Sequence, residues 1–105
     1  MTDLSYLRQL LGGDERMVAR FLEAFKTEVP RQLELLSDAL RTGDRETANI
    51  TAHAIKGQLK YLGQESLAAV AYQIEQRTEA GSDLQTAAEL LSALREGLEG
   101  LLKEI

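Results

Sequence analysis

The sequence contains no cysteine, no tryptophan and one proline, and only 5% of its residues are aromatic. Without cysteine, disulfide frameworks, thiol nucleophiles and thiolate metal sites are excluded, and nothing requires an oxidising compartment. We therefore expect a cytoplasmic protein. The aromatic residues that favour strands are scarce, whereas Ala, Leu, Glu, Gln and Arg, which favour helices, are abundant. This composition predicts an all-α fold.

Positive charge and long apolar runs are also in short supply. The chain has 12 basic and 17 acidic residues, which gives a net charge of −5. An acidic protein repels nucleic-acid phosphates and anionic lipid headgroups, so we expect no binding to nucleic acid or to membranes. No stretch approaches the ~18 apolar residues of a membrane span, and Met1 to Tyr6 do not resemble a secretory signal.

The 105 residues suit one domain, spanning 1–105, with a single core. Capping residues and apolar residues recurring at three and four positions predict five helical segments. These segments are 4–11, a long one from the Asp14 cap to Gly43, one from the Asp44 cap to Leu62, one carrying Leu67 to Ile74, and one from Leu84 to Ile105. Pro30 should bend the long helix without ending it, because the apolar stripe continues in phase. Short connections predict a monomeric, up-down antiparallel four-helix bundle with a short extra N-terminal helix.

Residues that could carry chemistry are few. One histidine with scattered carboxylates offers no set of converging metal ligands, and the glycines form no phosphate-binding loop. The sequence therefore predicts no metal site, no ATP-binding site and no bound cofactor.

The helix predicted over 45–62 places that histidine on its outer face. Its apolar stripe is about 80° wide and His53 points the opposite way. The stripe consists of Ala48, Ala52, Ile55, Leu59 and Leu62. With His53 on the outer face lie Glu46, Asn49, Lys56, Gly57 and Lys60, and along one flank lie Ile50, Ala54 and Tyr61. His53 is thus either a functional group or an idle surface residue.

Gly57 favours a functional histidine. A glycine inside a helix costs about 1 kcal/mol relative to alanine, and this one follows His53 by one turn on the same face. It could serve a close helix crossing, but its position away from the apolar stripe favours the approach of an external group. Lys56 and Lys60 bracket the same point, so the pattern predicts a positive patch suited to an anion beside the imidazole. These features together are those needed to carry a phosphoryl group.

The segment from Ala52 to Gly63 resembles the signature of histidine-containing phosphotransfer (HPt) domains of bacterial and fungal two-component phosphorelays. The matching residues are His53, Ile55, Lys56, Gly57, Leu62 and Gly63, followed by Leu67, Ile74 and Glu75. The sequence departs from the family at Gln58 and Leu59, where small residues are usual. Some members carry a glutamine at the position of Glu75 that hydrogen-bonds the histidine, and Gln73 or Gln76 is an alternative source of that amide here.

The resemblance implies a phosphorelay intermediate that accepts a phosphoryl group on His53 from a receiver-domain aspartate and passes it to another receiver. It implies that Lys56 stabilises the phosphoryl oxygens and that Gly57 provides clearance. Residues expected to contact the partner are Asn49, Ile50, Ala54, Lys60 and Tyr61. The domain would be a phosphocarrier without autokinase activity, and Mg²⁺ would belong to the receiver. The expected partners are response-regulator receivers and a sensor or hybrid histidine kinase.

Two other interpretations remain open at this stage. The acidic bundle could be a helical adaptor that binds a partner helix, with His53 incidental. Alternatively, the chain could be a phosphoacceptor domain from a larger hybrid or chemotaxis-type kinase. The flank of Ile50, Ala54 and Tyr61 could likewise pack on a neighbouring helix and contact no partner.

Overall fold

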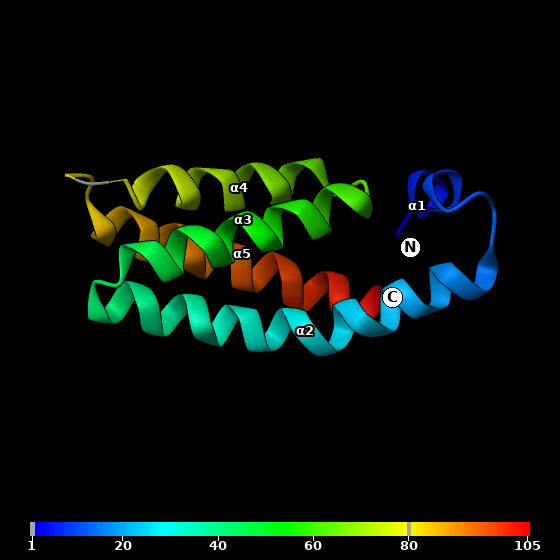
Figure 1. Ribbon diagram of the computed structural model, residues 1–105, viewed down its shortest axis with the longest axis horizontal. Coiled ribbons are helices and arrows are strands. Elements are labelled where there is room, and N and C mark those ends of the chain that lie inside the picture. The colour runs from blue at the N-terminus through cyan, green and yellow to red at the C-terminus, as the bar shows by residue number, and fades with distance from the viewer. Residues whose placement is uncertain (1, 80) are drawn as a thin grey trace.

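The computed structural model describes residues 2–79 and 81–105, and all of the regular structure within them is helical (Figure 1). The helices are α1 (Ser5–Leu10), α2 (Glu15–Thr42), α3 (Arg45–Tyr61), α4 (Glu65–Arg77) and α5 (Leu84–Glu104). The predicted all-α fold and its five segments are confirmed. Helix α2 continues through Pro30 as a single helix, as its unbroken apolar stripe indicated.

Side chains at the helix starts explain why the boundaries lie where they do. The Asp14 carboxylate accepts hydrogen bonds from the backbone N–H groups of Arg16 and Met17, which have no partner within the helix. Asp44 and Asp83 cap α3 and α5 in the same way. Helix α2 ends at Gly43, whose φ of 76° is a left-handed conformation that glycine adopts without strain. The sharp turn at Gly43 and Asp44 therefore reverses the chain between α2 and α3.

Helices α2 to α5 form an elongated antiparallel bundle, and the structure including α1 measures 44 × 20 × 19 Å (Figure 1). Each of these helices packs against the next, and α5 also packs against α2, which closes the bundle. Helix α1 lies at one end, against α2 and α3, with Leu7 buried there. None of the helices in the described ranges has the length and apolar character needed to cross a membrane.

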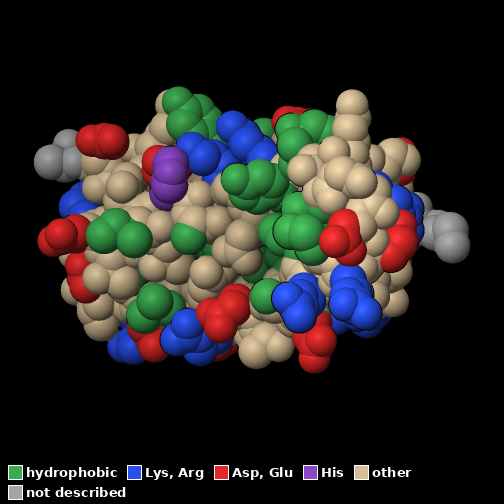
Figure 2. All heavy atoms as spheres, turned by 45° about the vertical axis from the view of Figure 1, so that its right-hand side comes forward, with side chains coloured by type: hydrophobic (Ala, Val, Ile, Leu, Met, Phe, Trp, Pro, Cys, Tyr) green, Lys and Arg blue, Asp and Glu red, His purple; other side chains and the backbone are tan. Residues whose placement is uncertain are grey.

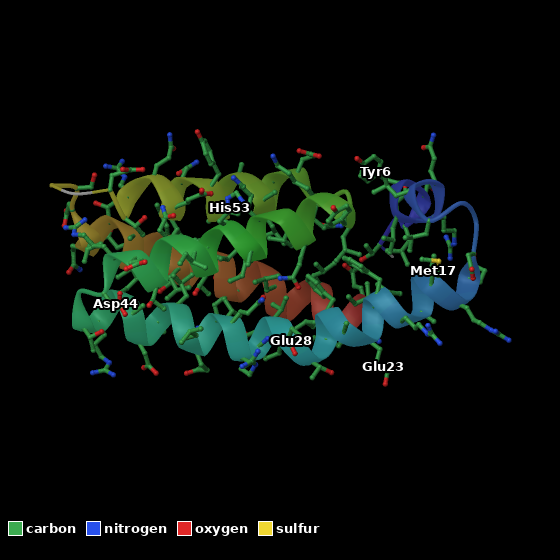
Figure 3. All side chains as sticks on the ribbon, viewed as in Figure 1. Tyr6, Met17, Glu23, Glu28, Asp44 and His53 are labelled. Atoms are coloured by element: carbon green, nitrogen blue, oxygen red, sulfur yellow. The ribbon has the colours of Figure 1, made fainter. Side chains whose placement is uncertain are left out.

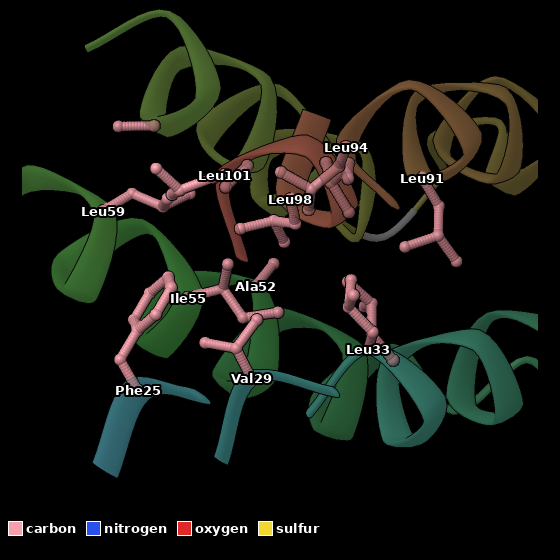
Figure 4. Packing of buried hydrophobic residues seen from close by; sticks show 14 of the residues in the cluster. Phe25, Val29, Leu33, Ala52, Ile55, Leu59, Leu91, Leu94, Leu98 and Leu101 are labelled. Carbon is pink, nitrogen blue, oxygen red and sulfur yellow. The ribbon is translucent and has the colours of Figure 1, made fainter. Parts of the chain in front are cut away.

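The core runs along the bundle axis and receives side chains from all four long helices (Figure 4). Helices α2 and α5 supply mainly large residues, including Phe25, Val29, Leu94 and Leu98. The buried positions of α3 and α4 include several alanines, namely Ala48, Ala52, Ala68 and Ala71. Small side chains allow two helices to approach closely, so α3 and α4 form the tightest pair of the bundle. This close pairing brings the polar side chains at their edges within reach of one another.

Candidate functional site

Helix α3 presents His53 at the molecular surface. All five apolar residues predicted to face the core from this helix are buried, and His53 on the opposite side has a side chain that is 66% exposed. Figure 2 shows the imidazole standing out from the surface with basic side chains beside it, and Figure 3 places it near the middle of α3. The predicted exposure of His53 is confirmed.

The imidazole is held by a carboxylate from the neighbouring helix. Nδ1 of His53 lies 3.0 Å from Oε2 of Glu75, in the second half of α4. An ionised carboxylate only accepts hydrogen bonds, so Nδ1 must carry the proton and donate it. The other ring nitrogen, Nε2, has no hydrogen-bond partner among residues 2–79 and 81–105. The contact therefore selects one tautomer and leaves the Nε2 lone pair available.

Glu75 is partly buried between the imidazole of His53 and the ammonium group of Lys56. Its side chain is 18% exposed, and Lys56 Nζ lies 2.9 Å from Oε1. The ammonium group of Lys56 is the ion-pair partner of Oε1, which is itself buried. Burial opposes ionisation of the carboxyl, but hydrogen bonding and charge from Lys56 and His53 outweigh it and lower the pKa of Glu75. Glu75 is therefore a carboxylate at neutral pH.

Lys56 is more enclosed than the helical projection predicted. Its side chain is only 14% exposed, and its ammonium group also lies over the ring of Tyr72, 4.9 Å from the centroid. The prediction of an open positive patch made by Lys56 and Lys60 is wrong in this respect, because α4 approaches closely enough to cover and pair Lys56. Lys60 remains exposed.

Gly57 faces open space, one helical turn after His53. A Cβ atom added at this position would meet no atom within 4 Å. The glycine therefore serves no internal helix crossing, which was the alternative explanation for it. A close crossing occurs instead at Gly97 of α5, where an added Cβ would collide with the Leu67 side chain.

The model of the family described as "Hpt domain" matches residues 20–104, nearly the whole chain. The chain belongs to the Hpt domain family. Members of this family take part in histidine phosphotransfer in two-component systems, as phosphocarrier modules that interact with receiver domains and kinases. Searches of curated proteins and of solved structures found no match.

In this Hpt domain α3 exposes apolar side chains on its outer face and at its junction with α2. Ile50 is 62% exposed, and Tyr61 is exposed while its ring edge contacts Phe21 of α2. Gln58 donates a hydrogen bond to Gln32 across the same junction, at 2.8 Å. The larger residue at position 58 thus links α3 to α2, where the family usually has a small one. Ile50 reaches solvent, whereas Tyr61 both packs on α2 and stays accessible.

Asn49 differs from the other residues predicted to contact a partner. Its amide donates hydrogen bonds to Oγ1 of Thr78, at 2.9 Å, and to the backbone carbonyl of Glu75, at 3.3 Å. The amide is therefore engaged in fixing the end of α4 against α3. Its placement on the open outer face was wrong, because the helical projection of α3 could not include the helix that covers that edge.

Sequence reasoning left the partner of His53 open and missed one residue of the site. Among Glu75, Gln73 and Gln76, the structure selects Glu75, and both glutamines are exposed. Tyr72 was missed entirely. The available signal was its position one turn before Glu75, which places both side chains on the same edge of α4.

The described residues contain no group of three or more His, Asp or Glu side chains that could hold a metal ion. The site consists of one imidazole, one carboxylate and one ammonium group. Such a set can orient a nucleophile and offset the charge of an anion.

Proposed function

We propose that His53 is the phosphoacceptor of this Hpt domain, and that it takes a phosphoryl group from a receiver aspartate and passes it to a second receiver. The observation that carries the proposal is the pairing of Nδ1 with Glu75, which leaves Nε2 of an exposed imidazole without a partner. A nucleophile needs an accessible lone pair and a fixed orientation, and this arrangement supplies both.

The transfer step balances without an external acid or base. The Nε2 lone pair attacks phosphorus of the aspartyl phosphate, the N–P bond forms, and the P–O bond to the aspartyl group breaks. Its electron pair returns to the aspartate carboxylate. The ring then carries a positive charge with the proton still on Nδ1, facing the Glu75 carboxylate at 3.0 Å. A carboxylate in this position stabilises the charge that develops on the ring.

Transfer to the second receiver reverses these steps. An aspartate carboxylate of that receiver attacks phosphorus, the N–P bond breaks, and its electron pair returns to Nε2. The imidazole is again neutral. Because the proton remains on Nδ1 throughout, the pairing with Glu75 serves both directions.

Lys56 and Gly57 would support the reaction in different ways. The ammonium group of Lys56 lies on the Glu75 side of His53 and would offset the charge of the phosphoryl oxygens. Gly57 leaves the space one turn further along α3 open to the incoming receiver. We expect Mg²⁺ to be held by the receiver and no cofactor to be held by this domain, which would act as a carrier and not as a kinase.

The apolar flank next to α2 suits receiver docking. Ile50 and Tyr61 expose apolar area beside His53, with Ala54 between them and Lys60 at the edge. Apolar contact surrounded by polar groups is typical of transient protein interfaces. Asn49 would act indirectly, by holding α4 in place.

Incubation with a phosphorylated receiver tests the proposal. Intact-mass analysis should show one added phosphoryl group that is lost in acid, as expected of a phosphoramidate, and His53→Gln should show none. ATP alone should add nothing to a preparation free of kinases. An adaptor with an incidental histidine would bind a partner without gaining mass, and labelling of His53→Gln would refute the assignment of His53.

A further inference from the structure

Tyr72 and Glu75, both on α4, contact the ammonium group of Lys56. The Lys56 Nζ atom lies 4.9 Å from the ring centroid of Tyr72 and 2.9 Å from Oε1 of Glu75. Tyr72 and Lys56 line a groove of about 450 Å³ between α3 and α4. The ammonium group is therefore held by an aromatic face and a carboxylate, next to a groove that is open to solvent.

The position of Tyr72 on α4 does not serve the core. Its side chain is 48% exposed, whereas the core positions of α4 are Ala68, Ala71 and Ile74. No hydrogen bond of its hydroxyl group is found in the described part of the chain. The contact with Lys56 is thus the specific interaction that the structure gives this ring.

An aromatic face and a carboxylate restrain a lysine in different ways. The carboxylate offsets the positive charge of the ammonium group, while the ring attracts it through its quadrupole and adds no net charge. A lysine is a point charge on a flexible stem, so its position has to be restrained if it is to act at one place. The ring can supply that restraint without offsetting the positive charge any further.

We propose that Tyr72 is a positioning residue for phosphotransfer, which holds the ammonium group of Lys56 beside His53 through its ring and not through its hydroxyl group. The proposal rests on the function proposed above. It extends the site across α4 to a residue that forms no hydrogen bond with the imidazole or with its carboxylate partner in the described part of the chain.

The test compares Tyr72→Leu with Tyr72→Phe, each in the wild-type and the Lys56→Ala background. Rapid-quench measurement of transfer from a phosphorylated receiver, at several receiver concentrations, separates the limiting rate from half-saturation. Tyr72→Leu should lower the limiting rate by about 2- to 5-fold, the range expected of one cation–π contact, and leave half-saturation unchanged. Tyr72→Phe should transfer at the wild-type rate. In the Lys56→Ala background Tyr72→Leu should have no additional effect.

Several outcomes would overturn the role of Tyr72 while the wild-type domain still accepts the phosphoryl group. One is a limiting rate in Tyr72→Leu equal to that of the wild type, and another is a loss of rate in Tyr72→Phe as large as in Tyr72→Leu. The others are an effect of Tyr72→Leu that persists in the Lys56→Ala background and a change in half-saturation with no change in the limiting rate. Failure of the proposed function is recognised separately, because His53 of the wild-type domain would then remain unlabelled.

A measurement without phosphotransfer tests the contact itself. The ring current of Tyr72 should displace the side-chain proton resonances of Lys56 in the NMR spectrum. The displacement should persist in Tyr72→Phe and disappear in Tyr72→Leu, with thermal unfolding showing that both variants fold. Resonances of Lys56 that are the same in the wild type and in Tyr72→Leu would overturn the proposal whatever the domain's function.

Discussion

Helix α3 meets its two neighbours in different ways. Toward α4 it presents polar and charged side chains, and Asn49, His53 and Lys56 all have partners on that helix. Toward α2 it presents Tyr61, which remains largely exposed, together with the hydrogen bond from Gln58, and Ile50 is exposed on its outer face. The α4 side orients the imidazole and the ammonium group, while the α2 side leaves apolar surface open. In the proposed function, this arrangement would separate holding the nucleophile from binding and releasing the partners.

The largest effect is expected at His53, which lies between the α2 side and the α4 side of α3. His53→Gln should fold like the wild type, because the side chain is exposed and touches no core position. It should accept no phosphoryl group, which intact-mass analysis or radiolabel transfer would detect. If labelling persisted in this variant, neither side of α3 could be assigned a role in transfer.

Lys56 and Lys60 provide a matched pair for the α4 side. Lys56→Ala should slow phosphorylation about 10-fold or more, the scale of one charge-assisted contact of ~1.5–3 kcal/mol. Lys60→Ala should have a smaller effect, because Lys60 is exposed and has no partner from α4 among the described contacts. Rapid-quench kinetics would measure both rates. Equal losses would mean that charge near the site matters and that the pairing of Lys56 does not.

A larger side chain at position 57 tests whether the space beside the imidazole must stay open for the receiver. Gly57→Gln should slow transfer several-fold, because its side chain would project into volume that is empty in the free domain and that a docked receiver must enter. Thermal unfolding should show no loss of stability, since the position faces solvent. A variant that transfers normally would indicate that the receiver approaches from another direction.

The contribution of Glu75 to the free energy of unfolding should depend on pH. Glu75→Gln should lower the free energy of unfolding by about 1–2 kcal/mol at pH 7, because it removes a partly buried anion from the ammonium group of Lys56 and from the N–H group of His53. A carboxyl group whose pKa is lowered by folding stabilises the folded state above its usual pKa, near 4.5, and that stabilisation is lost as the pH falls through the lower folded-state value. The difference between wild type and variant should therefore shrink below about pH 4.5. Denaturant unfolding at pH 7 and at pH 3.5 measures it, and a difference independent of pH would contradict the ion pair.

The smallest effects are expected from Gly57 and Gly97, two glycines that lie inside helices with different surroundings. Gly57→Ala should stabilise the domain by ~0.4–1 kcal/mol, because alanine favours the helix and the added methyl group meets nothing. Gly97→Ala should gain less or lose stability, because the methyl group meets Leu67. Melting temperatures of the two variants provide the comparison, and equal gains would show that Leu67 moves aside without cost.

Features that depend on a single helix were predicted well from the sequence. The 3.6-residue repeat put His53 opposite the buried stripe of α3, and the capping residues Asp14, Asp44 and Asp83 located three helix starts. These are properties of neighbouring residues in one chain segment. The family signature around Gly57 is also a pattern of neighbouring residues, so it could be seen in the sequence alone. The family match over residues 20–104 agrees with that resemblance.

By itself, the sequence determined the all-helical fold, the exposed histidine and the open position at Gly57, because spacing along one helix decides them. Only the tertiary structure decided that Glu75 holds the imidazole, that Lys56 is covered and paired, and that Tyr72 lies under its ammonium group. Those contacts depend on how α4 is rotated and how closely it approaches α3. That rotation and approach depend on how the buried residues of both helices, among them Ala52 and Ala71, pack in the core, which no pattern within a single helix specifies.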